Sequence, residues 1–562
     1  MTTGVPGAEL AEQVRAWIAD DVDPADGAEL QALLDSGDSG DDRELADRFA
    51  GTLEFGTAGL RGPLRAGPNG MNRTVVRRAA AGLAAWLVEQ GSAGQGGAGE
   101  PVPAWLVEQG SAGQGGAGEP VVVVGYDARH GSARFARDSA AIFAAAGFDA
   151  RLLPRPLPTP VLAFAVRQLG AAAGVMVTAS HNPASDNGYK VYAADGAQIV
   201  PPADREIEAA IRAVGASRAI PLADDAVTVL GDQLVDRYVE QVVALAADGP
   251  RGLRIVHTAM HGVGSEIAGR VLAAAGFADV SPVPQQATPD PDFPTVAFPN
   301  PEEPGALDLA IALATERSAD LVIANDPDAD RCAVAVPDAD GRWRMLRGDE
   351  VGVLLADALL RAGVRGTYAT TIVSSSLLRV LAAYYGVGYA ETLTGFKWVA
   401  RAAPDLAFGY EEALGYAVAP KLVLDKDGIS AALRVAELAA ELKAAGASLL
   451  DRLAELAARH GRHLTDQISI RVDDLSVIAD AMASLRASPP GRLLDADVAA
   501  EDLMPAADVL RWRWPGGRVV VRPSGTEPKL KAYLEVVEPG GSAAEAERRM
   551  ARLREQVSAL LP

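Results

Sequence analysis

Short apolar runs alternate with longer alanine- and leucine-rich stretches from Gly51 onwards, and glycine-rich or polar loops separate them. The short runs fit buried strands, and the longer stretches fit helices. This alternation is typical of layered α/β domains, in which ligands bind at the loops that follow the strands. The expected strands are Val121–Tyr126, Gly174–Thr178, Leu253–Thr258, Ala319–Ala324, Tyr368–Val373 and Val519–Arg522. The expected helices are Arg73–Gln90, Ser132–Ala146, Glu266–Ala275, Gly348–Ala362 and Gly428–Ala444.

The size and composition predict several compact domains. A chain of 562 residues is long enough for three or four domains of about 150 residues each. Hydrophobic residues make up 49% and charged residues 22%, which excludes a chain that is disordered as a whole. The first 50 residues have Leu10, Val14, Trp17 and Ile18 at helical spacing. They predict an acidic helical extension without chemistry of its own.

The charge and cysteine content exclude several classes of partner. The net charge is −22, which argues against nucleic acid or an anionic membrane, so an anionic substrate needs a local basic pocket. The single cysteine, Cys332, excludes a disulfide framework and fits a reducing compartment. The segment Met1 to Asp23 has no signal-peptide pattern, and no apolar run approaches the roughly 20 residues of a membrane span. We therefore predict a cytoplasmic protein with no membrane partner.

One perfect repeat interrupts the pattern. Ala85–Val102 reads AWLVEQGSAGQGGAGEPV, and Ala104–Val121 repeats the same letters 19 positions later. A repeat architecture needs more units than two, each with packing faces. We interpret the repeat as a single duplication that lengthens the loop before Val121, and we assign it no function.

The most informative segment is TASHNP (178–183), which follows an expected strand and precedes NGYK (187–190). A serine in such a polar turn can act as a nucleophile or phosphoryl carrier, and this one is Ser180. His181 and Lys190 can move protons or hold phosphate oxygens. A simple capping turn is the alternative. A hydrolase nucleophile elbow is disfavoured, because Gly-x-Ser-x-Gly is absent around Ser180.

A second loop, NDPDADR (325–331), directly follows the apolar strand that ends at Ala324. Asp326, Asp328 and Asp330 stand at alternate positions, so their carboxylates can converge on a hard cation and leave coordination positions for phosphate. A solvated acidic turn is the alternative. An EF-hand is disfavoured, because Arg331 stands at the place of the loop glycine.

Two further loops offer groups for a sugar phosphate. GYEEALG (409–415) carries Glu411 and Glu412, whose carboxylates can accept hydrogen bonds from neighbouring sugar hydroxyls, although glutamate pairs are usually surface features. RPSGTEPK (522–529) follows the expected strand Val519–Arg522. Its arginine, hydroxyls and glycine-turn N–H groups form an anion cradle suited to a phosphate, and a plain turn is the alternative.

In content and order these loops resemble those of the α-D-phosphohexomutase superfamily, which contains phosphoglucomutases, phosphomannomutases and phosphopentomutases. The resemblance runs from Glu54 to Leu534 and includes FGTAGLRG (55–62), GYDAR (125–129), LPTP (157–160) and TAMHG (258–262). It implies a four-domain α/β architecture: three similar mixed-sheet α/β domains and a C-terminal α+β domain around a central cleft. We accordingly divide the chain into a helical extension, 1–50, and domains 51–205, 206–345, 346–455 and 456–562. These domains carry, in turn, the serine, metal, sugar and phosphate loops.

The resemblance also implies roles for individual residues. Ser180 corresponds to the phosphoserine, and it binds one Mg²⁺ per active site together with Asp326, Asp328 and Asp330. The other implied catalytic residues are Arg61, His181, Lys190 and Lys426. The implied substrate-binding residues are Arg331, Thr394, Gly395, Lys397, Glu411, Glu412, Arg522, Ser524, Gly525 and Thr526.

The implied reaction interconverts hexose 1-phosphate and hexose 6-phosphate, with glucose or mannose as the sugar. It passes through a bisphosphate that reorients in the site, and a sugar bisphosphate is the implied activator. Ala413 stands where many members have serine, and TLTGFKW (392–398) resembles the longer branch that includes phosphopentomutases. A pentose phosphate is therefore the alternative substrate.

Other classes of protein are the alternatives to a mutase. A Mg²⁺ phosphatase built on the acidic loop would leave the loops of Ser180 and Arg522 unexplained. A non-catalytic sugar-phosphate sensor would keep the same pockets. A dinucleotide site at Gly262-Val263-Gly264 is excluded, because the third glycine of that fingerprint is missing. We expect a monomer or homodimer that binds a small phosphosugar and no nucleic acid.

Overall fold

The structure is a computed structural model, and it describes residues 7–36, 39–56, 59–93, 119–472, 474–524 and 529–562. The chain divides into two compact units. Unit 1 holds the chain up to Ala335 together with Ala419–Leu433, and unit 2 holds Val336–Val418 together with Arg434–Pro562. Six predicted site or motif residues lie outside the described residues: Thr57, Ala58, Gly525, Thr526, Glu527 and Pro528. Most of the tandem repeat, residues 94–118, lies outside them as well.

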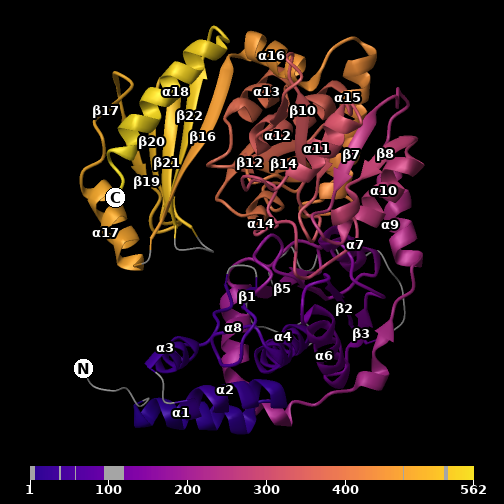
Figure 1. Cartoon of the computed structure of the whole chain (residues 1–562), viewed down its shortest axis with the longest axis vertical. Coiled ribbons are helices and arrows are strands. Elements are labelled where there is room, and N and C mark those ends of the chain that lie inside the picture. The colour runs from indigo at the N-terminus through magenta and orange to yellow at the C-terminus, as the bar shows by residue number, and fades with distance from the viewer. Residues whose placement is uncertain (1–6, 37–38, 57–58, 94–118, 473, 525–528) are drawn as a thin grey trace. The chain divides into compact units, whose positions relative to one another are not determined.

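The N-terminal extension of unit 1 is helical, as expected (Figure 1). Its helices are α1 (Ala8–Asp20), α2 (Pro24–Ser36) and α3 (Ser39–Arg48). Val14, Leu30 and Leu45 are fully buried in one small apolar cluster. The hydroxyl of Thr74, in the following domain, donates a hydrogen bond of 2.8 Å to Oδ1 of Asp21. The extension is therefore packed onto the first domain by its apolar helix faces and tied to it by a buried polar contact.

The first α/β domain has a six-stranded sheet in the order β1-β5-β4-β2-β3-β6. Its strands are β1 (Gly59–Pro63), β2 (Val121–Tyr126), β3 (Asp149–Leu152), β4 (Ala173–Val177), β5 (Asp186–Ala193) and β6 (Thr228–Val229). Its helices are α4 (Arg73–Ala93), α6 (Ser132–Ala145), α7 (Thr159–Gln168) and α8 (Ala203–Ala213). The edge strand β6 lies beyond the expected boundary at 205, because it pairs in parallel with β3.

The second domain has a five-stranded sheet in the order β11-β10-β9-β7-β8, and the division between the two units falls within β10. Its strands are β7 (Arg254–Thr258), β8 (Asp279–Pro282), β9 (Leu321–Ala324), β10 (Ala333–Pro337) and β11 (Trp343–Met345). Its helices are α9 (Gln233–Val243), α10 (Gly264–Ala274) and α11 (Asp308–Glu316). The strand β9 is buried along its whole length, as its continuous apolar run predicts.

The third domain has a four-stranded sheet in the order β13-β12-β14-β15. Its strands are β12 (Thr367–Thr371), β13 (Gly388–Thr392), β14 (Leu406–Glu411) and β15 (Gly415–Ala417). The helices of this part of the chain are α12 (Gly348–Arg361), α13 (Leu377–Tyr385), α14 (Phe396–Val399), α15 (Gly428–Ala444) and α16 (Leu449–His460).

The same four-strand order occurs in all three domains: β5-β4-β2-β3, β10-β9-β7-β8 and β15-β14-β12-β13. In each, three strands are parallel, and the fourth (β5, β10 or β15) is antiparallel to its neighbour among them. The antiparallel pair is consecutive in sequence, so the loop that joins it starts at the carboxyl end of a parallel strand. Three similar mixed sheets are therefore confirmed, and the serine, metal and sugar loops occupy the same topological place, where open α/β sheets bind ligands.

The last domain has an antiparallel sheet in the order β16-β22-β21-β20-β19. Its strands are β16 (Arg462–Arg471), β19 (Ala499–Asp502), β20 (Leu510–Trp514), β21 (Gly517–Pro523) and β22 (Lys529–Glu538), beside a small hairpin of β17 (Arg492–Leu493) and β18 (Ala496–Asp497). Helices α17 (Leu475–Ala487) and α18 (Ala543–Ser558) cover this sheet (Figure 1). Leu553 and Val557 of α18 are buried with Trp512 and Val519 of the sheet. No helix among the described residues is both long and apolar enough to cross a bilayer.

Candidate active site

Ser180 lies in the loop between the buried strand β4 and its antiparallel partner β5. Its backbone has a φ of 53°, a left-handed conformation that is uncommon for a residue other than glycine. Its N–H donates a hydrogen bond of 2.9 Å to the hydroxyl of Thr178, which fixes the turn. The side chain is buried, at 2% exposure. The predicted serine thus stands at the end of a rigid strand in a held conformation.

Arg129 organises this serine loop. Its guanidinium donates hydrogen bonds of 2.5 to 3.1 Å to four loop carbonyls, those of Ser180, Asn182, Pro183 and Asp186. The planar fork of an arginine suits such a set of fixed acceptors. Arg129 belongs to the GYDAR motif (125–129), and its role was not predicted from the sequence. The only sequence signal is an arginine just beyond the end of a strand, which does not reveal contacts more than fifty residues away.

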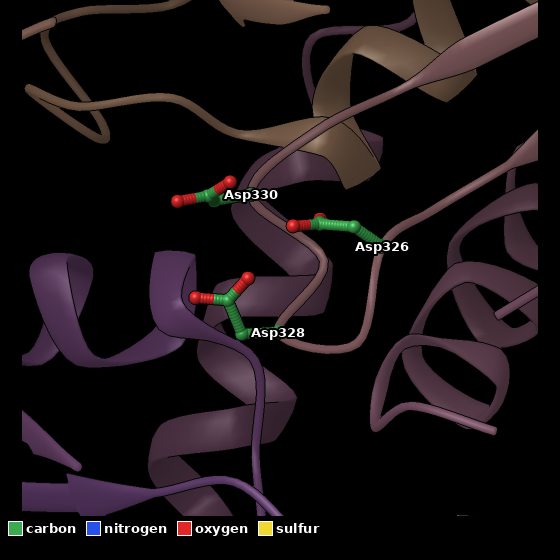
Figure 2. Close-up of side chains that lie close together, drawn as sticks. All are labelled: Asp326, Asp328 and Asp330. Carbon is green, nitrogen blue, oxygen red and sulfur yellow. The ribbon is translucent and has the colours of Figure 1, made fainter. Parts of the chain in front are cut away.

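The acidic loop lies between β9 and β10. Asp326, Asp328 and Asp330 each offer a carboxylate oxygen, and these three atoms lie within 4.8 Å of one another. Figure 2 shows the three side chains, from alternate positions of one loop, with their carboxylates on the same side. All three residues are buried, at 1% exposure or less. The convergence expected from their spacing is therefore present, whereas the alternative of a solvated acidic turn is excluded.

The serine and acidic loops meet. The hydroxyl of Ser180 donates a hydrogen bond of 2.7 Å to Oδ2 of Asp326. On the other side of the acidic loop, Nζ of Lys190 lies 2.7 Å from Oδ2 of Asp328 and 3.1 Å from Oδ2 of Asp330. The hydroxyl of Thr159 donates a further bond of 2.7 Å to Oδ2 of Asp328. Parts of the chain nearly 150 residues apart thus form one polar centre in unit 1.

The acidic loop fits a divalent cation. Among the described residues, Oδ1 of Asp328 and Oδ1 of Asp330 are buried and have no hydrogen-bond partner. Buried carboxylates are costly unless a cation or hydrogen bonds compensate their charge. Three carboxylates offer hard oxygen ligands, which Mg²⁺ and Mn²⁺ prefer. The donor set and its unused oxygens therefore match such an ion.

The pKa values of this centre follow from burial and charge. Burial and the neighbouring carboxylates of Asp328 and Asp330 raise the pKa of Asp326 well above its ordinary value. Burial acts in the same direction on Asp328, but the ammonium of Lys190 outweighs it and lowers the pKa of that carboxyl. Burial alone would lower the pKa of Lys190, and the two carboxylates that it contacts raise it instead. Lys190 and Asp328 are thus held as an ion pair, while the charge of Asp326 calls for a further cation.

His181 and two arginines surround the serine. Nδ1 of His181 lies 3.2 Å from the hydroxyl oxygen of Ser180. Burial, together with the charges of Arg331 and Arg61, lowers the pKa of His181 well below its ordinary value, so the imidazole is neutral at pH 7. Arg61 donates a hydrogen bond of 3.1 Å to Oδ1 of Asn182 in the serine loop. The backbone N–H of Arg331 donates one of 3.1 Å to Oδ1 of Asp326.

Lys426 reaches the same centre from a distant part of the chain. Its Nζ lies 3.3 Å from Oδ2 of Asp330, and its side chain is buried. It belongs to the segment Ala419–Leu433, which packs in unit 1 although the residues on both sides of it belong to unit 2. Unit 1 therefore brings together the acidic triad Asp326, Asp328 and Asp330 with Ser180, His181, Lys190, Arg331 and Lys426. Arg61 is connected to this centre through its hydrogen bond to Asn182 of the serine loop.

The remaining predicted residues belong to unit 2. Oε2 of Glu412 accepts hydrogen bonds from the hydroxyls of Thr371 (3.1 Å) and Ser374 (3.0 Å). The ammonium of Lys397 is buried and lies 5.3 Å from the ring centre of Trp398. The other described substrate-binding candidates in unit 2 are half-buried: Thr394, Gly395, Glu411, Arg522 and Ser524. Gly525 and Thr526 lie outside the described residues.

The TAMHG segment (258–262) and the residues on either side of it support the acidic loop. Val263 donates a backbone hydrogen bond of 2.9 Å to the carbonyl of Pro327. Gly262 lies so close that a Cβ built on it would stand 2.3 Å from Cα of Pro327. Nε2 of His257 lies 2.8 Å from Oδ1 of Asn325, whose amide donates to the carbonyl of Arg331. The role of these residues was not predicted, because packing against a loop more than sixty residues away leaves no local sequence pattern.

Comparison with known proteins agrees with this geometry. Residues 106–218, 236–341 and 347–459 match the profiles of phosphoglucomutase/phosphomannomutase α/β/α domains I, II and III, and residues 468–556 match the C-terminal domain of that family. The chain is 46% identical over 506 residues to a probable phosphomannomutase from Haemophilus influenzae, covering 88% of this chain and 98% of that protein. It is 33% identical to a phosphopentomutase from Mus musculus, covering 95% of this chain and 92% of that protein.

A solved structure has the same fold. The phosphoglucomutase/phosphomannomutase family protein from Burkholderia thailandensis superposes with a TM-score of 0.67 at 21% identity, covering 91% of this chain and 98% of the other. The four matched domains, the full-length relatives and the polar centre of serine, acidic triad and lysines lead to one conclusion. The chain belongs to the phosphoglucomutase/phosphomannomutase family and is a phosphosugar mutase.

Proposed function

We propose that this mutase interconverts hexose 1-phosphate and hexose 6-phosphate, with glucose or mannose as the sugar, through phosphorylated Ser180. The observation that carries the proposal is the hydrogen bond of 2.7 Å from Ser180 to Asp326, which joins the phosphoryl carrier to the acidic triad. The cations of Lys190, Lys426 and Arg331 lie against the three carboxylates of the triad, so a bound Mg²⁺ would make this a local positive site in a chain of net charge −22. Such a site can attract a phosphate dianion that the protein as a whole repels.

In the proposed first step, a hydroxyl oxygen of the sugar phosphate forms a bond to the phosphorus on Ser180. The bond from phosphorus to Oγ of Ser180 breaks, a base takes the proton of the sugar hydroxyl, and Oγ receives a proton and becomes the serine hydroxyl again. His181 is our candidate for that base, since its imidazole is neutral and its Nδ1 lies 3.2 Å from Oγ of Ser180. The bisphosphate then turns around, and its other phosphoryl group returns to Ser180 by the reverse step. The net change is an isomerisation with no loss of phosphate.

Charge neutralisation supplies most of the rate in this scheme, because phosphoryl transfer has a loose and highly charged transition state. Asp326, Asp328 and Asp330 would hold Mg²⁺, which would offset charge on the transferring group. Lys190, Arg61 and Arg331 would bind phosphoryl oxygens. In unit 2, Glu411 and Glu412 would accept hydrogen bonds from sugar hydroxyls, near Thr394, Gly395 and Lys397. Arg522 with Ser524, Gly525 and Thr526 would bind the phosphate that is not reacting.

A pentose phosphate is the second candidate substrate. The phosphopentomutase from Mus musculus aligns with 95% of this chain, and Ala413 offers no hydroxyl in the loop proposed to hold the sugar. We also propose a sugar bisphosphate as activator, which would phosphorylate Ser180. A cytoplasmic site of action fits the single cysteine, Cys332, which is buried and free.

The test is phosphorus NMR on the purified protein with Mg²⁺ and a trace of glucose 1,6-bisphosphate. Glucose 1-phosphate, mannose 1-phosphate and ribose 1-phosphate are offered in separate tubes. We expect the signal to move to the terminal-phosphate position without free phosphate, fastest with a hexose. Fastest turnover of ribose 1-phosphate would identify a phosphopentomutase, and release of inorganic phosphate would identify a phosphatase.

The change Ser180→Ala tests the phosphoryl carrier. We expect turnover to fall by at least about 10³-fold, because no other hydroxyl can take the phosphoryl group at that position. The variant should keep its thermal unfolding temperature within a few degrees of the wild type, since alanine fits the space of the serine side chain and the change removes only the contacts of one hydroxyl. Full activity in this variant would contradict the assignment of Ser180.

A further inference from the structure

Three consecutive charged residues are buried where the chain returns to unit 1. Asp425, Lys426 and Asp427 are 1%, 8% and 2% exposed. A run of aspartate, lysine and aspartate followed by glycine would ordinarily lie in solvent, because burying charge is costly without partners. The side-chain partners of these three residues come from the first two domains.

Asp425 is held from the first sheet. Its Oδ2 accepts a hydrogen bond of 2.9 Å from the hydroxyl of Tyr192 and another of 2.9 Å from the amide of Gln198. Tyr192 is fully buried near the end of β5, and Gln198 bridges to it across a tight turn. The second carboxylate oxygen of Asp425 accepts from the N–H of Lys426. Tyr192 is thus fixed by β5 and Gln198 by its bridge to Tyr192, which leaves the carboxylate little freedom.

Asp427 is held from the second domain. Its Oδ1 accepts a hydrogen bond of 2.8 Å from the hydroxyl of Tyr238, which is fully buried on α9. The same oxygen accepts from the N–H groups of Ile429 and Ser430 at 3.0 Å, which caps the start of α15. The two aspartates on either side of Lys426 are therefore each fastened by a tyrosine hydroxyl from a different element.

The lysine between them needs this fastening. Lys190 and Lys426 both direct their ammonium groups to Oδ2 of Asp330, at 3.1 and 3.3 Å. Two like charges that share one carboxylate oxygen repel each other. Lys190 comes from β5, two residues before Tyr192 and so on the same face of that strand. The same face of β5 therefore carries Lys190 and Tyr192. The hydroxyl of Tyr192 in turn holds Asp425, the residue next to Lys426.

We propose that Tyr192 and Tyr238 are positioning residues that, through Asp425 and Asp427, hold the ammonium of Lys426 at Asp330 in the acidic loop. Neither tyrosine contacts the reacting atoms in this assignment, and each acts through its aspartate. The inference deepens the proposed function and rests on it, because Lys426 is one of the proposed catalytic side chains.

The test measures how accessible Lys426 is. The full-length protein is treated with formaldehyde and a borane reductant, and mass spectrometry follows the methylation rate of each lysine. Lys421, exposed in the same segment, is the internal standard. We expect Lys426 to be methylated about tenfold faster, relative to Lys421, in Tyr192→Phe and in Tyr238→Phe than in the wild type, because each loses a hydrogen bond to a charged group. Tyr189→Phe is the matched control, since Tyr189 lies on the same strand but packs in the core of the first domain.

A second variant guards against loss of folding. Gln198→Met removes the other donor to Asp425 with little change in volume, so it should also speed the methylation of Lys426. Equal methylation of Lys426 in the wild type, Tyr192→Phe, Tyr238→Phe and Gln198→Met would overturn the proposal. So would a rise in Tyr189→Phe as large as in the other two tyrosine variants, because that rise would report general loosening.

A kinetic cycle separates positioning from a purely structural role. In the mutase assay, Tyr192→Phe should lower kcat about tenfold with KM nearly unchanged, and should cause no further loss when Lys426 is already methionine. An undiminished loss in the Lys426→Met background would overturn the proposal. A wild type without mutase activity, but with faster methylation of Lys426 in the tyrosine variants, would instead contradict the proposed function and leave the positioning role intact.

Discussion

At the scale of single residues, the three loops between antiparallel partners share one conformational feature. Each contains a non-glycine residue with positive φ: Ser180 at 53°, Ala329 at 55° and Leu414 at 64°. A residue with a Cβ pays about 1 kcal/mol for this conformation, so surrounding contacts must impose it. At Ser180 those contacts are the hydroxyl of Thr178 and the guanidinium of Arg129. The backbone strain falls at the loops that we propose to bind the metal and the sugar phosphate.

One buried carboxyl gives the folded state a dependence on pH. Burial raises the pKa of Asp349 to about 7, from an ordinary value of 3.8. Its Oδ1 accepts hydrogen bonds from the N–H of Ser375 and the hydroxyl of Tyr410, which a neutral side chain can also accept. The folded state therefore holds this proton more tightly than the unfolded state, and its stabilising effect is complete below pH 4 and lost as pH rises through 7.

The change Asp349→Asn tests this dependence. Asparagine keeps the accepting oxygen and cannot ionise, so the variant should gain stability over the wild type as pH rises from 5 to 8, by about 2.5 kcal/mol. Thermal unfolding at several pH values measures the difference. The same change at exposed Asp340 is the control and should leave the pH dependence unaltered. A difference that stays constant from pH 5 to 8 would contradict the raised pKa.

At the scale of elements, the expected strands and helices agree closely with the structure. Val121–Tyr126 coincides with β2, and the expected helix Gly428–Ala444 coincides with α15. The other expected elements are also present, with bounds that differ by one to three residues. Only six strands were expected, and β5 and β10, which complete the serine and metal loops, were not among them. Both directly follow polar catalytic loops, so their apolar residues do not form an isolated run, and only pairing with β4 and β9 defines them as strands.

The packing of one loop against another gives a matched pair of glycine changes. In Gly262→Ala the new Cβ would meet the backbone of Pro327, which cannot move without displacing the acidic loop. We expect a loss of about 2 kcal/mol in stability and weaker Mn²⁺ binding, measured by thermal unfolding and calorimetric titration. Gly269→Ala, on α10 with no atom within 4 Å of the new Cβ, should be neutral or stabilising by about 0.5 kcal/mol. Equal effects of the two changes would contradict a packing role for Gly262.

At the scale of the whole molecule, the chain passes between the two units three times, after Ala335, Val418 and Leu433. The predicted divisions at 205, 345 and 455 stay predictions, and the family profiles end or begin close to them, at 218, 341 and 459. The first profile begins at residue 106, inside the second copy of the tandem repeat. The family pattern thus continues from the second copy into β2, while the first copy begins within α4.

Removing one copy of the repeat tests whether the extra length matters. Deletion of residues 103–121 joins Val102 to Val122 and leaves the letters GEPVVVVGY at the junction. The connection between α4 and β2 becomes 19 residues shorter, which should stabilise the fold by about 1 kcal/mol through a lower loop-closure entropy. We expect unchanged mutase activity and an equal or slightly higher unfolding temperature. A deletion variant that fails to fold, or that loses activity, would show that both copies are needed.

The sequence by itself determined the α/β class, eleven of the helices and strands, and the residues of the serine and acidic loops. Local chemistry was sufficient there, because apolar runs that end in polar loops report both the strand and its functional end. The tertiary structure alone decided that Arg129 organises the serine loop, that Lys426 returns to Asp330, and that Tyr192 and Tyr238 hold the residues beside it. These contacts join parts of the chain from about fifty to more than two hundred residues apart. A buried charge needs a partner to offset the cost of its burial. A sequence pattern shows the charge without showing which partner the fold will bring to it.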